Sequence, residues 1–206
     1  MKLNYPKNYS TVLRFEQHLF HNAYNLAIDS CILYIHESYP TSFSLAVLSY
    51  EGLGKLHLVD HVGFEARLSR SEDWDGRLEH LFVSGRKNSG LIFKHRAKQE
   101  WATFGAGLED STELGKLDKL KQSGFYVGFE KGRIKTPDQI TRHRAFRQIQ
   151  RVIKVFDETQ DLAFYGVWDD SDEESQRAAS EYINKLHDAF SELQPPATKR
   201  KQSKKD

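Results

Sequence analysis

The most constraining part of this chain is Tyr50-Glu51-Gly52-Leu53-Gly54-Lys55, in which a glutamate and a lysine stand one helical turn apart. At 100° per residue, a helical wheel places Glu51 and Lys55 within an apolar stripe. Their neighbours on that stripe are Val47, Leu48, Leu58, Val59 and Val62. Ionised groups are unfavourable in such a stripe unless they meet partners there. We therefore expect both side chains to face another helix or to line a buried polar pocket.

The two glycines in this sequence support a close contact. A glycine in a helix interior is less favourable than alanine by about 1 kcal/mol. We expect close approach of another helix or of a ligand to offset Gly52 and Gly54. The alternative is an ordinary ion pair between Glu51 and Lys55 on an exposed helix face, which contributes only a few tenths of a kcal/mol.

Hydrophobic periodicity predicts helices on both sides of this sequence. The expected helices cover residues 10–37, 42–70, 78–104 with an interruption near 85–90, 112–121, 137–164 and 173–193. Pro40 is expected to end the first of them, and Thr41 or Ser42 to cap the second. The pattern predicts an all-α helical bundle, with residues 1–194 as a single domain and 195–206 as a disordered basic tail.

Two shorter signals refine this prediction. Phe125-Tyr126-Val127-Gly128-Phe129 is the one run that is typical of a strand, so we expect a short irregular or hairpin-like insertion near residues 123–135. Thr136-Pro137-Asp138-Gln139 is typical of a helix start, because threonine caps helices, proline suits the first helical position and glutamine completes a capping box.

Composition limits the classes of function. The 206 residues carry 30 Lys or Arg against 29 Asp or Glu, so a surface for nucleic acid has to be local. The single cysteine, Cys31, excludes an internal disulfide framework and an all-cysteine metal site. No apolar run is long enough for a secretion signal or a membrane span. We expect a cytoplasmic protein that does not enter membranes and needs no cofactor or metal.

A second polar group of residues is Lys94-His95-Arg96-Ala97-Lys98. On a helix, His95 and Lys98 lie on one face. A histidine exchanges protons near neutral pH, and a lysine stabilises negative charge on a reacting phosphate. The pair suits metal-free RNA cleavage, in which a 2′-OH attacks the adjacent phosphate. The alternative is a solvated basic face.

A basic stripe follows later in the chain. It consists of Arg144, Arg147, Arg151 and Lys154. Such a stripe fits a nucleic-acid backbone, although a solvated helix face is the alternative.

Taken together, these segments resemble the AbiV family of abortive-infection proteins, which belongs to the HEPN superfamily. The resemblance rests on Asn22-Ala23, Leu45-Ala46, the Glu51–Lys55 sequence, Phe93–Lys98, Lys121–Val127 and Pro137, in that order. It covers about residues 20–149.

The resemblance implies a helical bundle that often forms a homodimer. It implies a bacterial anti-phage abortive-infection effector that acts as a metal-independent endoribonuclease on host or phage RNA, with a phage-encoded activator protein as a further partner. Carried over to this chain, the catalytic residues are His95, Lys98, Glu51 and Lys55. Asn22 is carried over as well, and we expect it to bind the substrate together with Arg96, Arg147 and Arg151.

The chain departs from the usual HEPN pattern, in which about four to six residues separate an arginine from a histidine. Arg86 stands nine positions before His95, whereas Arg14 and His21 have six residues between them but lie in the first helix. The alternative function is therefore a non-catalytic HEPN-fold module that binds RNA, a nucleotide or another protein. A third hypothesis is that the polar residues form a purely structural network.

Overall fold

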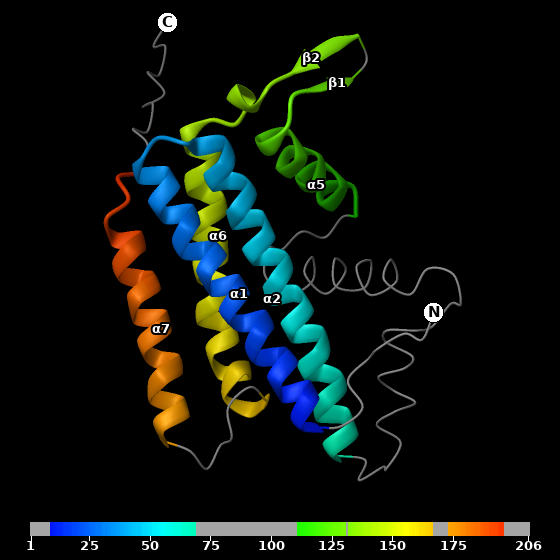
Figure 1. Cartoon of the computed structure of the whole chain (residues 1–206), viewed down its shortest axis with the longest axis vertical. Coiled ribbons are helices and arrows are strands. Elements are labelled where there is room, and N and C mark those ends of the chain that lie inside the picture. The colour runs from blue at the N-terminus through cyan, green and yellow to red at the C-terminus, as the bar shows by residue number, and fades with distance from the viewer. Residues whose placement is uncertain (1–8, 69–110, 131, 167–172, 196–206) are drawn as a thin grey trace, which may run out of the picture.

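The computed structural model describes residues 9–68, 111–130, 132–166 and 173–195. The helices in these ranges are α1 (Tyr9–Ile35), α2 (Tyr39–Leu68), α5 (Ser111–Phe125), α6 (Arg142–Gly166) and α7 (Glu173–Ser191). Long helices lie side by side, with α1 between α7 and α2 and with α6 behind them (Figure 1). The expected all-α, HEPN-like bundle is confirmed. The expected helix over 78–104 lies outside the described residues, as does the tail after Pro195.

The connection between α1 and α2 is tighter than expected. Glu37 adopts a left-handed conformation with φ of 60°, and the Ser38 amide donates to the Leu33 carbonyl at 2.9 Å. Pro40 does not end the first helix but lies in the first turn of α2, where its missing N–H leaves no hydrogen bond unmade. This turn folds α2 back along α1.

Small residues let α1 and α2 approach closely. The Ser49 hydroxyl donates to the Ala23 carbonyl at 2.6 Å, so the two backbones meet at this point. A Cβ on Gly52 would lie 3.0 Å from the Ala23 Cβ. The expectation that a neighbouring helix explains Gly52 is therefore confirmed.

Aromatic side chains close the core between α1, α6 and α7. The Phe20 ring meets the rings of Phe156 and Tyr182 edge-on, with centroids 5.8 and 6.1 Å away. Cys31 is buried in the same core, and burial raises the pKa of its thiol to about 12. The thiol is therefore protonated and unreactive at neutral pH.

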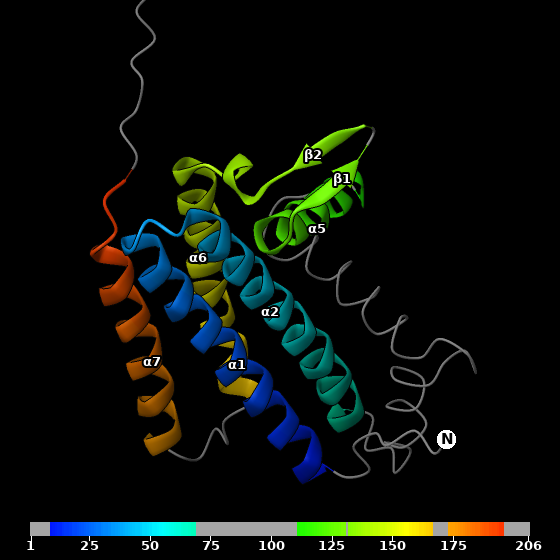
Figure 2. The same cartoon turned by 45° about the horizontal axis from the view of Figure 1, so that its top comes forward.

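The insertion beyond α5 is a hairpin. Strand β1 (Gly128–Glu130) pairs antiparallel with β2 (Arg133–Lys135), and Gly132 takes a positive φ of 76° in the turn. The hairpin lies beyond α5 at one end of the bundle (Figures 1 and 2). None of the helices in the described ranges combines the length and apolar character needed to cross a membrane.

The helix expected from Pro137 begins later. Pro137–Gln139 forms a single 3-10 turn, η1, and Thr136 makes no side-chain cap. Ile140 is buried in an extended conformation, so the chain bends there to bury an apolar side chain. α6 then starts at Arg142, and the Thr141 hydroxyl caps it by accepting the Arg144 amide at 3.3 Å.

Candidate active site

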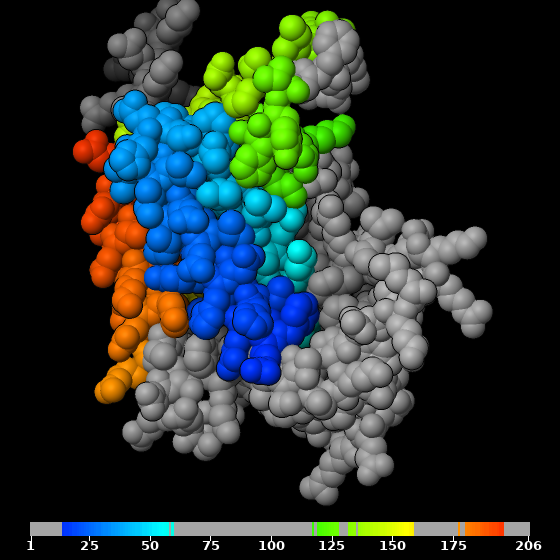
Figure 3. All heavy atoms as spheres, viewed as in Figure 1, coloured from blue at the N-terminus to red at the C-terminus, as the bar shows by residue number. Residues whose placement is uncertain are grey.

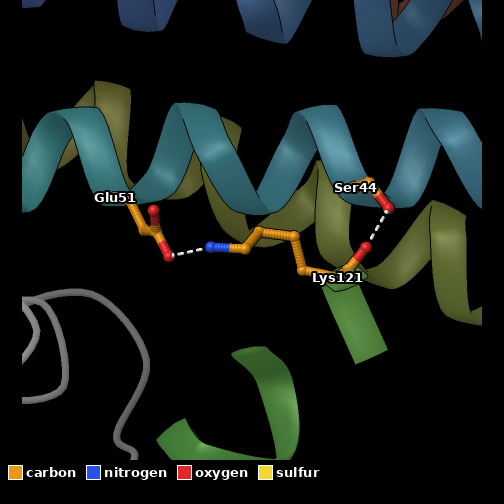
Figure 4. A network of polar contacts seen from close by, with 3 residues as sticks. All are labelled: Ser44, Glu51 and Lys121. Atoms are coloured by element: carbon orange, nitrogen blue, oxygen red, sulfur yellow. Dashed lines mark hydrogen bonds and ion pairs between the residues drawn. The ribbon is translucent and has the colours of Figure 1, made fainter. Parts of the chain in front are cut away.

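The central polar contact of the described structure joins α2 to α5. The Lys121 ammonium Nζ lies 2.5 Å from Oε1 of Glu51, and the two side chains are only 5% and 10% exposed (Figure 4). The residues are 70 positions apart in sequence. Glu51 is therefore buried on the inner side of α2 as expected, but its partner comes from a different helix.

Backbone contacts hold Lys121 in this position. The Ser44 hydroxyl lies 2.9 Å from the Lys121 carbonyl and 3.0 Å from the Pro40 carbonyl, and donates between them (Figure 4). A Cβ on Gly124 would lie 2.0 Å from Ser44 Oγ and 2.6 Å from the Pro40 oxygen. Only glycine fits at this position, and its missing side chain allows α5 to pack closely against α2.

The space-filling view shows the same packing from outside. The atoms of α5 sit directly against the upper part of α2 (Figure 3). Leu117, Lys121 and Gly124 are buried, and they recur at the spacing of one helix face. The contact surface of α5 is thus a narrow strip with a charged residue at its centre.

A buried ion pair of this kind orients helices more than it stabilises them. Removing both ions from water opposes folding, and their attraction offsets this only when the geometry is good. Removing one partner is different, because an unpaired charge then stays buried. The pair therefore couples the position of α5 to the Glu51 segment of α2.

Sequence reasoning missed Lys121 as a site residue. It named Glu51 and Lys55 together, but Lys55 is half-buried and takes no part in the ion pair of Glu51. The spacing of Leu117, Lys121 and Gly124 would have placed Lys121 on the buried face of its helix. Nothing in the sequence indicates which buried carboxylate it meets.

The other expected site residues are spread over the molecule. Asn22 is exposed on α1, and Arg147 and Arg151 are exposed on α6. His95, Arg96 and Lys98 lie outside the described residues. Within the described part, the structure brings Glu51 together with Lys121 and leaves Asn22 on a different helix from Arg147 and Arg151.

Tyr50 adds a further buried polar group beside Glu51 in the sequence. Its side chain is fully buried, and burial raises the pKa of the phenol far above neutrality, although the charge of Arg151 partly opposes this. The phenol stays protonated at physiological pH. It can donate a hydrogen bond there but cannot act as a general base.

The basic stripe on α6 faces solvent as a group. Arg144, Arg147, Arg151 and Lys154 are all exposed. Lys154 also lies 3.3 Å from the Glu158 carboxylate, an exposed pair that contributes little to stability. This face is available to an anionic partner.

Comparison with known protein families gives a match over more than half of the chain. The family model for AbiV matches residues 11–157, which include both partners of the buried ion pair. No curated protein and no solved structure is significantly similar to the chain.

Proposed function

Since the chain belongs to the AbiV family of HEPN abortive-infection proteins, we propose that it acts as a metal-independent endoribonuclease on host or phage RNA. The observation that carries the proposal is the buried Glu51–Lys121 pair, because it joins two of the segments on which the resemblance to the family rests. Lysine and glutamate side chains are rarely buried unless they are paired, and buried charges of this kind are candidates for a positioning or chemical role.

The proposed reaction is attack of a ribose 2′-OH on the adjacent phosphate. The bond from phosphorus to the 5′ oxygen breaks, leaving a cyclic 2′,3′-phosphate and a free 5′-OH. His95 takes the proton of the attacking hydroxyl or gives one to the leaving oxygen. Lys98 and Lys55 stabilise the charge on the phosphate oxygens as it grows.

Glu51 and Lys121 have a positioning role in this scheme. Glu51 holds the Lys121 ammonium, and Ser44 holds the backbone of the same residue. Together they fix α5 against the turn of α2 that leads to Lys55. Asn22, Arg96, Arg147 and Arg151 would bind the RNA on either side of the reacting phosphate.

The test is cleavage of total RNA by the purified protein in EDTA. The wild type is expected to produce fragments with cyclic phosphate ends, and His95→Ala and Lys98→Met to reduce the rate at least 100-fold. The matched control is His36→Ala, because His36 is exposed at the end of α1. Cleavage at the wild-type rate by His95→Ala would remove that residue from the mechanism.

Binding without cleavage would favour the alternative, a non-catalytic module. A mobility shift of RNA by the wild type with no fragments in any condition is the result that separates the two. If neither occurs, and Glu51→Gln with Lys55→Met only lowers the melting temperature, the polar residues are structural.

The same proposal includes a cytoplasmic homodimer that a phage-encoded protein activates. A dimer would place the sites of two protomers in one cleft. The cleft would then hold twice as many basic groups as the site of a single protomer. Light scattering on the purified protein measures the oligomeric state. Co-expression with individual phage genes identifies an activator by the growth arrest that it triggers.

A further inference from the structure

Apart from the basic tail, positive charge is concentrated in one segment of this nearly neutral chain. Residues 131–156 contain eight Lys or Arg and a single acidic residue, Asp138. The rest of the chain has 22 Lys or Arg and 28 Asp or Glu, and is net acidic. A local cationic surface on an otherwise acidic protein attracts a polyanion to that place.

The fold brings the two exposed parts of this segment to the same end of the bundle. β2 leads through η1 directly into α6, and the hairpin and the first turns of α6 lie at the same end of the bundle (Figures 1 and 2). Arg133 is exposed on β2, and Arg144 and Arg147 are exposed on α6. The guanidinium of Arg144 also donates to the Gln139 carbonyl at 3.5 Å, which directs it toward η1. From Arg144 to Lys154 the basic face extends about 15 Å along the helix.

Exposed apolar side chains lie at the same end of the bundle, on or beside the hairpin. Tyr126 is 66% exposed, Val127 69% and Ile134 66%, all on or beside the hairpin. The Phe125 ring lies 6.2 Å from that of Tyr126 and is itself partly exposed. An open aromatic ring next to guanidinium groups is the combination that binds single-stranded nucleic acid, because bases stack on the ring while cations hold the phosphates.

We propose that the hairpin and the basic face of α6 form a binding surface for single-stranded RNA, separate from the buried Glu51–Lys121 pair. Tyr126 stacks on an unpaired base, and Arg133, Arg144 and Arg147 hold the neighbouring phosphates. The choice of RNA rests on the proposed function, whereas the single-stranded form rests on the exposed ring. A duplex keeps its bases stacked inside and would offer Tyr126 nothing to stack on.

A protein partner is the competing occupant of this surface. Val127 and Ile134 would suit an apolar contact, but the cations around them favour a polyanion over an average protein surface. The positive charge of this surface therefore favours a nucleic acid over a protein as its partner.

The experiment measures binding of a fluorescent single-stranded oligoribonucleotide by anisotropy. The probe carries 2′-O-methyl groups, because it then lacks the attacking hydroxyl and cannot be cleaved. A duplex of the same sequence is the comparison. The wild type is expected to bind the single strand at least tenfold more tightly than the duplex.

Two variants separate stacking from charge. Tyr126→Ala is expected to weaken single-strand binding about 5- to 100-fold, whereas Tyr126→Phe retains it. Arg147→Ala is expected to weaken binding to both probes. It is also expected to reduce the slope of log K against log salt concentration by about 1, the value for one lost phosphate contact. Lys185→Ala, an exposed lysine on α7, is the matched control and is expected to bind as the wild type does.

Several results would overturn this inference. The first is equal binding of the single strand and the duplex, and the second is wild-type affinity in Tyr126→Ala. The third is a change in the oligomeric state of Tyr126→Ala without a change in RNA binding. That third result would assign the surface to a protein contact. The proposed function fails separately. If the wild type binds the probe but never cleaves unmodified RNA, the binding surface stands and the ribonuclease does not.

Discussion

Replacing Lys121 by methionine tests the coupling between α2 and α5 directly. Methionine has a similar length and no charge, so the variant leaves the Glu51 carboxylate in a site where its side chain is only 10% exposed. Breaking a buried pair from one side destabilises a protein by about 3–5 kcal/mol. In a chain of this size that corresponds to a fall in Tm of about 6–20 °C.

The double variant shows whether the loss comes from the stranded charge. With Glu51→Gln added to Lys121→Met, no ion remains buried, so we expect part of the stability to return. Lys119→Met is the matched control, because Lys119 is exposed on the same helix, and we expect a change within about 1 kcal/mol.

Urea unfolding followed by circular dichroism supplies the free energies for this cycle. The reasoning is refuted if Lys121→Met shifts the free energy of unfolding by less than 1 kcal/mol. It is also refuted if the double variant is less stable than Lys121→Met alone.

Three further predictions concern individual buried residues. Gly124→Ala places a methyl group against the Pro40 carbonyl and should lower the free energy of unfolding by about 1–3 kcal/mol; a neutral result in urea unfolding would mean that α5 does not pack as closely as described. Gln148 is 2% exposed, and its amide nitrogen has no hydrogen-bond partner in the described structure. Gln148→Met should therefore raise the free energy of unfolding by about 1 kcal/mol, and a lower Tm would contradict this. Burial raises the pKa of the Cys31 thiol from 9.0 to about 12, so the folded state keeps a proton that the unfolded state loses. The stability from this group is complete well below pH 9 and declines as the pH rises toward 12, by about 1 kcal/mol at pH 10. Cys31→Ala should lack this part of the alkaline decline, which paired unfolding curves at pH 8 and pH 10 would detect.

Periodicity was sufficient for the helices because it reports a local property. Apolar residues at helical spacing predict which face of a helix is buried, whatever it packs against. This is why the burial of Glu51 and the meaning of Gly52 could be inferred before any tertiary contact was known. The hairpin could be expected for a similar reason, since a short strand-like run needs an adjacent partner.

Helix ends were less predictable because a local signal competes with burial of a side chain. Pro40 suits either the end of one helix or the first turn of the next, and the close return of α2 along α1 decides between them. Thr136 and Pro137 are typical of a helix start, yet burying Ile140 bends the chain and moves that start to Arg142.

The amino-acid pattern alone was enough to predict a helical bundle and its family, and it favoured a buried carboxylate at Glu51 over an exposed ion pair. The partner of that carboxylate depended on the tertiary structure. Lys55 is four residues away and Lys121 seventy, and spacing favours the nearer one. The packing of Gly124 against Ser44 and Pro40 sets the height of α5 along α2 and so brings the Lys121 ammonium to Glu51. A long-range contact of this kind depends on the packing of many other residues. The identities of the two residues that it joins therefore do not predict it.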